Sequence, residues 1–323
     1  MKKKYLLALN LCLLAPLTIH AAEKPVAKSA EKSTEGSDFG KLTFFPEQNT
    51  FVNNFSLSYT EDDYTLKNSI LSIDVKNKTT AATESIEYSF LPNQEIDLEF
   101  SYAQEKLTTS VGTANDTKSS GFGNPVLAYR FRFMKQKEQP LNIDFYGKFS
   151  ADLIEKRTAT TTDDGTVSSG KNVFTAGALF SGEQGAFVWS LTPEVVYNGE
   201  EKAKNANTSV TSTTDPYMTF AIGGDGQFFF TPMFAADFGL GFEFIPETTT
   251  KPDNQNSITT ESRALAQLRL GVNAIVIPNK LDIYLHLSGT SASDADVKQS
   301  GVTTYKIADE KVSAATLGAK VYF

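Results

Sequence analysis

Apolar and polar residues alternate one by one along most of the chain, in segments of roughly ten residues that begin near Phe51. In "FVNNFSLSY", the side chains of Phe51, Phe55, Leu57 and Tyr59 fall on one face, and the serines between them fall on the other. This period of two is typical of a β-strand with two unlike faces, and no helical period competes with it. The pattern returns through "EIDLEFSY", "PVLAYRFRF" and "LNIDFYGKFSAD" to the terminal "SAATLGAKVYF". We expect about twelve strands.

The links between these segments alternate in length. Short links rich in turn residues, such as "LPNQ", "EQG", "TPM" and "IPNK", alternate with long polar ones such as "TTSVGTANDTKSS" and "EKRTATTTDDGTVSSGK". Short turns at one end, long loops at the other and an even strand count predict an all-β fold over residues 49–323. We interpret it as a transmembrane antiparallel meander β-barrel with short periplasmic turns and long extracellular loops. A soluble β-sandwich is the alternative, in which the alternating charges would face water.

Aromatic residues favour the membrane barrel over the sandwich. On the apolar face they concentrate near the short-turn end of the strands, where a barrel places an interfacial girdle. The girdle is predicted to contain Phe131, Phe133, Trp189, Phe228, Phe230 and Phe323.

The first 48 residues have a different composition. Residues 1–21 combine a Lys-rich start, a short apolar run and a small residue before a cleavage site, which predicts a secretory signal peptide; the run is short for the alternative, a membrane anchor. Residues 22–48 are rich in Lys, Glu, Ser and Ala, so we expect a flexible tail, with an inward-folded plug as the alternative.

Composition excludes several kinds of site. The single cysteine, Cys12, lies in the expected signal peptide, and His286 would be the only histidine of the mature chain, so we expect no metal site, cofactor or disulfide. A net charge of -8 and an isoelectric point near 5.0 argue against nucleic acid as a partner.

The polar face of a barrel lines its lumen, and here that face carries both signs of charge. Arg130 and Arg132 share one strand face and could hold an anion, or could be neutralised by Asp144 on the next strand. For any one charged residue, the alternative to solute selection is an ion pair that only stabilises the barrel. The candidate lumen residues are Arg130, Arg132, Asp144, Lys148, Glu194, Arg263, Arg269, His286 and Lys320.

Two features of the sequence suggest functions other than a pore. Asp282, His286 and Ser288 share one strand face, but steps of about 7 Å along a strand are too long for the contacts of about 3 Å in a catalytic triad, so we expect no enzyme. Loops rich in Thr, Ser and Asn also suit a surface adhesin or receptor. An outer-membrane hydrolase is the less favoured alternative.

The strand order and glycine placement of "EIDLEFSYAQEKL", "GFGNPVLAYRFRF", "PLNIDFYGKFSADL" and "FVWSLTPEVVYNG" resemble the outer-membrane transporters grouped with the phenol-degradation MetA pathway. The resemblance implies a Gram-negative outer membrane and aromatic or hydrophobic solutes, and it carries over no substrate-binding residue. The alternation that ends at Phe323 is similar to the signal that such barrels present to their assembly machinery.

We therefore expect a pore or facilitated-diffusion channel for small solutes, exported to the cell outer membrane, where lipid and lipopolysaccharide surround it. The solute is not encoded in any motif of the sequence. The charged lumen suits small polar or anionic solutes, whereas the family resemblance implies aromatic or hydrophobic ones.

Overall fold

A computed structural model describes residues 40–323 except 111–114, 137–140, 207–209, 254 and 301. The expected signal peptide and residues 22–39 of the expected tail lie outside the described residues. All regular elements in the described part are strands, which form one 19-stranded sheet. No helix in that part is long and apolar enough to cross a membrane.

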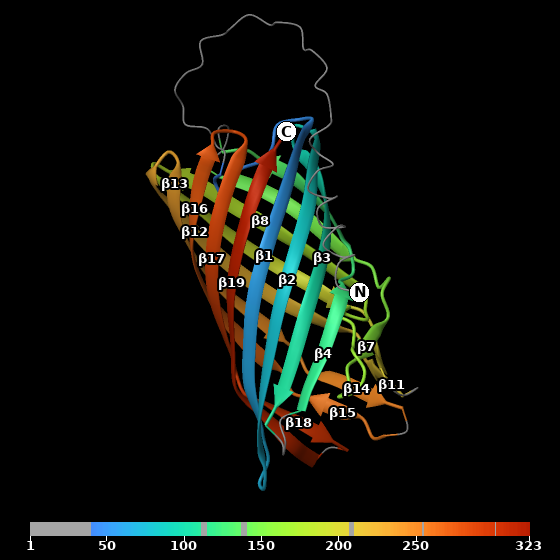
Figure 1. Cartoon of the computed structure of the whole chain (residues 1–323). Coiled ribbons are helices and arrows are strands. Elements are labelled where there is room, and N and C mark those ends of the chain that lie inside the picture. Colours follow the sequence, from blue (N-terminus) through green and yellow to red (C-terminus); the bar gives the residue numbers. More distant parts are fainter. Residues whose placement is uncertain (1–39, 111–114, 137–140, 207–209, 254, 301) are drawn as a thin grey trace, which may run out of the picture. The chain divides into compact units, whose positions relative to one another are not determined.

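Twelve of the strands form a closed antiparallel ring, as the sequence predicts (Figure 1). Each pairs with its neighbour in chain order, and the last pairs with the first from Val52 opposite Tyr322 onward. In ring order the strands are β1 (Thr50–Lys67), β2 (Ser72–Leu91), β3 (Gln94–Thr109), β5 (Val126–Met134), β6 (Asn142–Ser150), β8 (Val173–Gln184), β9 (Phe187–Asn198), β12 (Tyr217–Thr231), β13 (Phe234–Ile245), β16 (Arg263–Ile277), β17 (Leu281–Ala292) and β19 (Val302–Tyr322).

Ring closure has a physical cause in the alternating sequence. Each strand has one apolar and one polar face, and a closed barrel turns the first to lipid while pairing every backbone group in the wall. The outward side chains are accordingly exposed, as for Leu240 and Phe242, whereas the inward Asp144, Ser181 and Gln227 are almost fully buried. The polar side chains therefore form the interior of this protein.

The long links contain short strands that the alternation did not indicate. These are β4 (Asn115–Phe122), β7 (Lys156–Thr158), β10 (Glu201–Asn205), β11 (Thr211–Thr214), β14 (Thr248–Pro252), β15 (Ile258–Thr260) and β18 (Ala295–Gln299). Their sequences are rich in Thr, Ser and Lys, so both faces are polar and no hydrophobic period marks them. Each hydrogen-bonds to a neighbour beyond the apolar band.

These short strands complete a second ring at the long-loop end. The pairing runs from β7 through β10, β11, β14, β15 and β18 to β19, and thence through β1, β2 and β3 to β4. Gly165 joins β4 to this chain of strands, since its N–H donates to the Lys118 carbonyl at 2.8 Å. The next residue, Thr166, donates its N–H to the Arg157 carbonyl of β7 at 2.9 Å. The wall thus continues past the membrane without an open edge.

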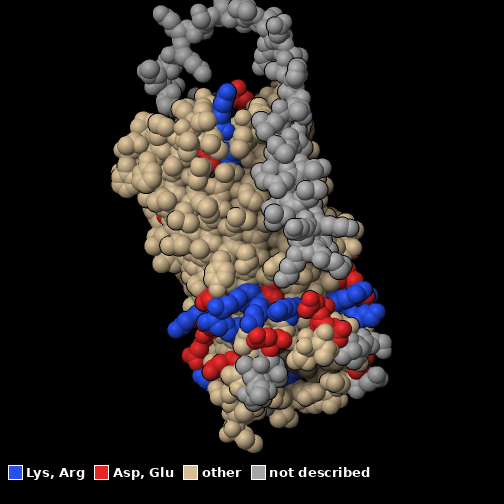
Figure 2. All heavy atoms as spheres, in the orientation of Figure 1, with Lys and Arg blue, Asp and Glu red and all other residues tan. Residues whose placement is uncertain are grey.

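The outer face shows where the apolar band ends. Figure 2 shows a broad zone almost free of charged residues, bounded toward the long-loop end by a belt of Lys, Arg, Asp and Glu. On β1 to β4 this belt contains the pairs Lys78 with Glu61 and Lys106 with Asp116, each at 2.7 Å. Exposed pairs of this kind contribute little to stability. Their position marks the boundary between hydrocarbon and water.

At the opposite end, the aromatic residues face outward. Phe133 packs against Phe145 with ring centroids 6.0 Å apart, and Phe228 packs against Phe230 at 5.2 Å. Trp189 lies over Gly182 on the neighbouring strand, where a Cβ would come within 2.9 Å of the indole. Phe323, 60% exposed, follows β19 and exchanges two backbone hydrogen bonds with Phe51. The girdle residues therefore lie on the lipid-facing side, with Phe131 on the same face of β5.

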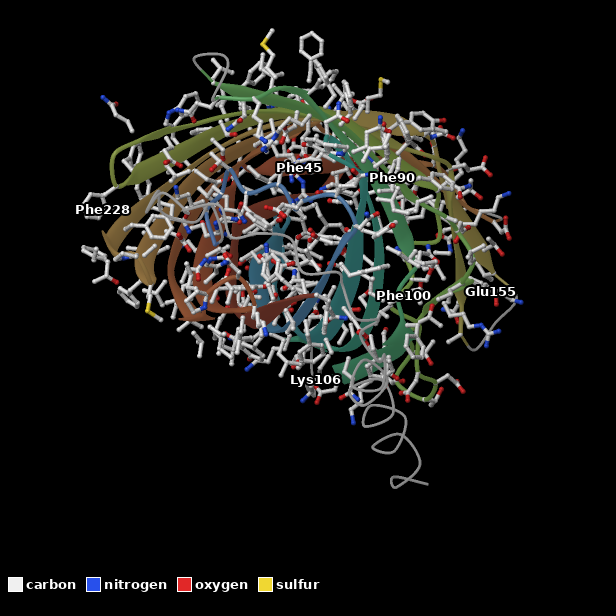
Figure 3. All side chains as sticks on the ribbon, turned by 90° about the horizontal axis from the view of Figure 1, so that it is seen from above. Phe45, Phe90, Phe100, Lys106, Glu155 and Phe228 are labelled. Carbon is white, nitrogen blue, oxygen red and sulfur yellow. The ribbon has the colours of Figure 1, made fainter. Side chains whose placement is uncertain are left out.

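The last residues of the expected tail are among those that the structure describes. Residues 40–46, named the lumenal segment below, lie inside the barrel and contact the wall, which is the arrangement of the inward-folded alternative. Figure 3, which looks along the barrel, shows Phe45 within the ring of strands, whereas Phe228 lies at its outer edge. The sequence "GKLTFFP" is much more apolar than the residues before it, and burying its two phenylalanines favours this position.

Candidate functional site

The lumenal segment crosses the interior and contacts opposite walls. The carbonyl of Gly40 accepts hydrogen bonds from Gln227 Nε2 of β12 at 3.0 Å and from Asn273 Nδ2 of β16 at 3.2 Å. At the other end, the Thr43 carbonyl accepts from Arg132 Nη2 of β5 at 3.0 Å. Strands β5 and β16 are diametrically opposite, because five strands separate them in either direction around the ring. The segment therefore spans the lumen.

Side chains of the segment add further contacts. Lys41 Nζ forms an ion pair with Glu183 of β8 at 2.7 Å, and the Leu42 N–H donates to Gln227 Oε1 at 3.1 Å. Phe44 packs edge-on against Tyr322 of β19, with ring centroids 5.3 Å apart. Gln227 is only 1% exposed and both ends of its amide are used. Buried polar groups that are satisfied in this way fix the position of the segment.

The two arginines proposed as an anion site are already paired. Arg132 donates from Nε and Nη2 to the two Asp144 carboxylate oxygens at 2.7 and 2.9 Å, and Arg130 donates from Nε to Oδ2 at 2.8 Å. Glu95 lies 3.5 Å from Arg130, and the Phe45 ring packs against both guanidinium groups at 4.9 and 4.7 Å. Asp144 is fully buried. Of the two alternatives for this stripe, the geometry matches neutralisation by Asp144.

A smaller cavity of about 260 Å³ lies beside this cluster. Tyr146 lines this cavity, and its hydroxyl donates a hydrogen bond to Glu194 of β9. Lys148 extends over the Tyr146 ring, with Nζ 5.3 Å from the centroid. The charged residues that line this space, named the acidic cavity below, are Glu87, Glu95, Asp97, Arg130, Lys148 and Glu194.

A larger cavity of about 500 Å³ lies against the lumenal segment. It is lined by Gly40, Lys41, Leu42, Phe44 and Pro46 of the segment and by polar side chains of β12 to β19. Glu87, Glu95 and Arg130 line this cavity as well as the acidic cavity, so the two spaces share a wall. Together they provide polar, charged volume beside the segment that crosses the lumen.

His286 lies in the larger cavity, where its carboxylate partner is Asp237 and not Asp282, the residue that shares its strand face. Its Nε2 is 3.2 Å from Asp237 Oδ2 of β13, and its ring stacks on Tyr284 with centroids 4.9 Å apart. Asp282 instead accepts from Asn273 Nδ2 at 3.4 Å. Ser288 lies one step further along β17. This is a pair of His and Asp with no nucleophile in contact among the described residues, which gives no geometry for acyl transfer.

The remaining lumen candidates are also inside the barrel. Arg263 of β16 pairs with Glu310 of β19, and Arg269 of β16 pairs with Asp225 of β12. Lys320 of β19 lines the larger cavity opposite Asp282 in the strand register. Most of these cations thus have acidic partners on other strands.

Sequence reasoning missed several residues that contact the segment or line the cavities, namely Phe45, Glu87, Glu95, Glu183, Gln227 and Asn273. The alternation places Gln227 and Asn273 on the inward face, but it does not say which inward amides meet another part of the chain. Among the described residues no group of three or more His, Cys, Asp or Glu side chains could hold a metal ion.

No protein-family model and no curated protein matches this sequence. Among solved structures, the COG4313 outer membrane channel from Pseudomonas putida F1 superposes with a TM-score of 0.60 at 13% identity, covering 89% of this chain and 100% of that one. The fold is that of a bacterial outer-membrane barrel. The transport unit of the autotransporter AIDA-I from Escherichia coli has the same architecture, with a TM-score of 0.51 at 11% identity over 89% of this chain and 95% of that one.

Proposed function

We propose that this protein is a narrow pore for small solutes in the outer membrane of a Gram-negative bacterium. The observation that carries the proposal is the charged interior of a closed twelve-strand barrel, with two adjoining cavities of about 500 and 260 Å³. Side chains fill the interior of eight-stranded barrels, whereas barrels of sixteen strands or more leave open aqueous channels. A barrel of this size with a lumenal segment suits restricted diffusion.

The comparison with the Pseudomonas putida structure supports this proposal through the fold. That protein is described as an outer membrane channel, and its barrel covers nearly the whole of this one. The lining residues then determine what this chain admits, because function is located in the site and not in the fold. Here the lining is polar and charged, so we propose small polar solutes as the substrates.

The resemblance to transporters grouped with phenol degradation implies a second class, aromatic or hydrophobic solutes. Phe44 and Leu42 give the larger cavity an apolar side, which favours this class. Liposome assays separate the two classes: entry of small sugars or amino acids supports polar solutes, and entry of phenol above the rate in empty liposomes supports aromatic ones.

The pore itself is tested by electrical recording. Purified protein inserted in planar bilayers is expected to give stepwise conductance, and proteoliposomes are expected to swell in small polar solutes. A heat-unfolded sample of the same preparation is the matched control, because it keeps composition and detergent constant. Absence of both conductance and swelling in the folded protein would rule out the pore.

Neither alternative function has comparable support from the described geometry. A hydrolase would need a nucleophile beside His286, and we propose that the protein is not an enzyme.

For an adhesin, the residues at the long-loop end would carry the binding activity. Deleting the stretch from Thr160 to Gly165 would then abolish binding while conductance remained. If the deletion abolished both conductance and binding, the long-loop end would not carry a binding activity separate from the pore.

A further inference from the structure

The charges inside the described barrel are unbalanced toward acid. On the twelve strands of the ring, inward Asp and Glu side chains outnumber the inward Lys and Arg side chains, which are Arg130, Arg132, Lys148, Arg263, Arg269 and Lys320. Most of the basic residues are held in ion pairs. The excess carboxylates are therefore the charges that a permeating solute meets.

The excess is concentrated in the acidic cavity. Glu87 of β2 and Asp97 of β3 are direct cross-strand partners, and neither forms an ion pair within the described residues. Like charges placed directly opposite each other on neighbouring strands repel. Of the two cations in this cavity, Arg130 is bound to Asp144, and Lys148 lies over Tyr146 without an ion pair in the described structure.

Two buried carboxylate oxygens in this cavity have no donor. Glu95 is 6% exposed, and while its Oε1 contacts Arg130, its Oε2 has no hydrogen-bond partner. Asp97 Oδ1 is likewise buried and unpartnered. A buried acceptor without a donor is destabilising, and more so when the group is charged. A small cation in the cavity would supply the missing electrostatic partner. The unpartnered oxygens support cation binding independently of the number of acidic residues.

The acidic cavity adjoins the larger cavity of the lumen. Glu87 and Glu95 line both cavities, and the larger cavity borders the lumenal segment that crosses the barrel. A solute that moves between the two spaces therefore comes within reach of these carboxylates. Charged rings in pores select the ions of opposite sign.

We propose that the carboxylates of Glu87, Glu95 and Asp97 attract cations by their shared negative charge, without chelating a metal ion, and so make the pore selective for small cations, namely alkali ions and small ammonium compounds. This inference rests on the proposed pore function. It reverses the anion preference considered for Arg130 and Arg132, because Asp144 and Glu95 already neutralise those arginines.

The reversal potential of single channels in a roughly tenfold KCl gradient tests the site. The reversal potential of the wild-type protein is expected to lie between zero and the equilibrium potential of potassium. The double variant Glu87→Gln and Asp97→Asn keeps size and hydrogen-bonding capacity, and it is expected to lower the ratio of potassium to chloride permeability about threefold. Lys148→Gln removes the unpaired cation of the cavity and is expected to raise the same ratio.

A matched control changes the same number of charges outside the lumen. Asp63→Asn with Asp116→Asn alters the outer belt, where both carboxylates pair with exposed lysines, and it should leave the permeability ratio unchanged. If wild-type channels conduct with no cation preference, or if the control lowers the ratio as much as the lumen variant does, the site is refuted while the pore stands. If no current flows at all, both the proposed pore and its proposed cation selectivity are refuted.

Discussion

One residue on the lipid-facing surface departs from the alternation that built the fold. Glu84 of β2 points outward between Phe55 of β1 and Phe100 of β3, and its Oε1 accepts a hydrogen bond from Asn53 Nδ2 at 2.9 Å. The hydrogen bond satisfies part of the carboxyl group, but lipid offers no donor for the rest. This position is therefore a local source of instability in an otherwise apolar face.

Replacing Glu84 by Leu is expected to raise the free energy of unfolding by about 1 kcal/mol, because acidic residues on the lipid face of a barrel are unfavourable. Urea unfolding in liposomes, followed by tryptophan fluorescence, measures the change. Glu84→Gln is the control, because it keeps an acceptor for Asn53 and removes only the acid. A fall in stability for the Leu variant would show that the bond to Asn53 outweighs the burial of the carboxyl group.

The pairing of Arg130 and Arg132 with Asp144 was only partly predictable from the sequence. The alternation placed Arg130, Arg132 and Asp144 on the inward face, and they lie inside the barrel. Their pairing depends on strand register, since Arg132 stands directly opposite Asp144 across β5 and β6. The alternation fixes the face of each residue but not its exact partner, because a shift of two residues keeps the same face, so the sequence left both alternatives for the arginines open.

Elements were predictable to different degrees. Strands in the apolar band were evident, because one face must be apolar to meet lipid. The short strands beyond it, such as β11 with the sequence "TSTT", face water on both sides and carry no such pattern. The sequence offered an inward-folded tail only as an alternative, because the lumenal segment is short and its partners Gln227 and Asn273 lie far away in the sequence.

The lumenal segment gives a prediction at the scale of the element. Deleting residues 22–46 is expected to increase single-channel conductance about twofold or more, because the crossing of the lumen is removed. The same deletion should lower the free energy of unfolding by about 1 to 3 kcal/mol, since Gln227 loses its backbone partners.

A deletion of residues 22–38 is the matched control for this prediction, because it leaves Gly40 to Pro46 in the chain. Its conductance should equal that of the intact protein. If the longer deletion conducts no better than the shorter one, the segment does not restrict the pore in the membrane.

For the whole molecule, the closed wall has a consequence for exchange of backbone hydrogens with solvent. Strands β10, β11 and β14 lie beyond the apolar band, where water reaches them, yet each is paired on both sides by hydrogen bonds. Their amide hydrogens should exchange with deuterium far more slowly than those of the turn at Ile70, which is 94% exposed. Exchange mass spectrometry of the protein in lipid discs measures both regions, and equally fast exchange would contradict a closed second ring.

The same continuity of the wall raises the mouth of the barrel beyond the charged belt. A barrel that ended at the charged belt would open within the layer of lipid headgroups, where phosphates and their divalent counterions determine the local ion composition. Because hydrogen-bonded strands carry the wall further, the mouth opens into the surrounding medium instead. The ions that enter the barrel at this end would then follow the salt of the surrounding medium, and membrane surface charge would have little influence on them.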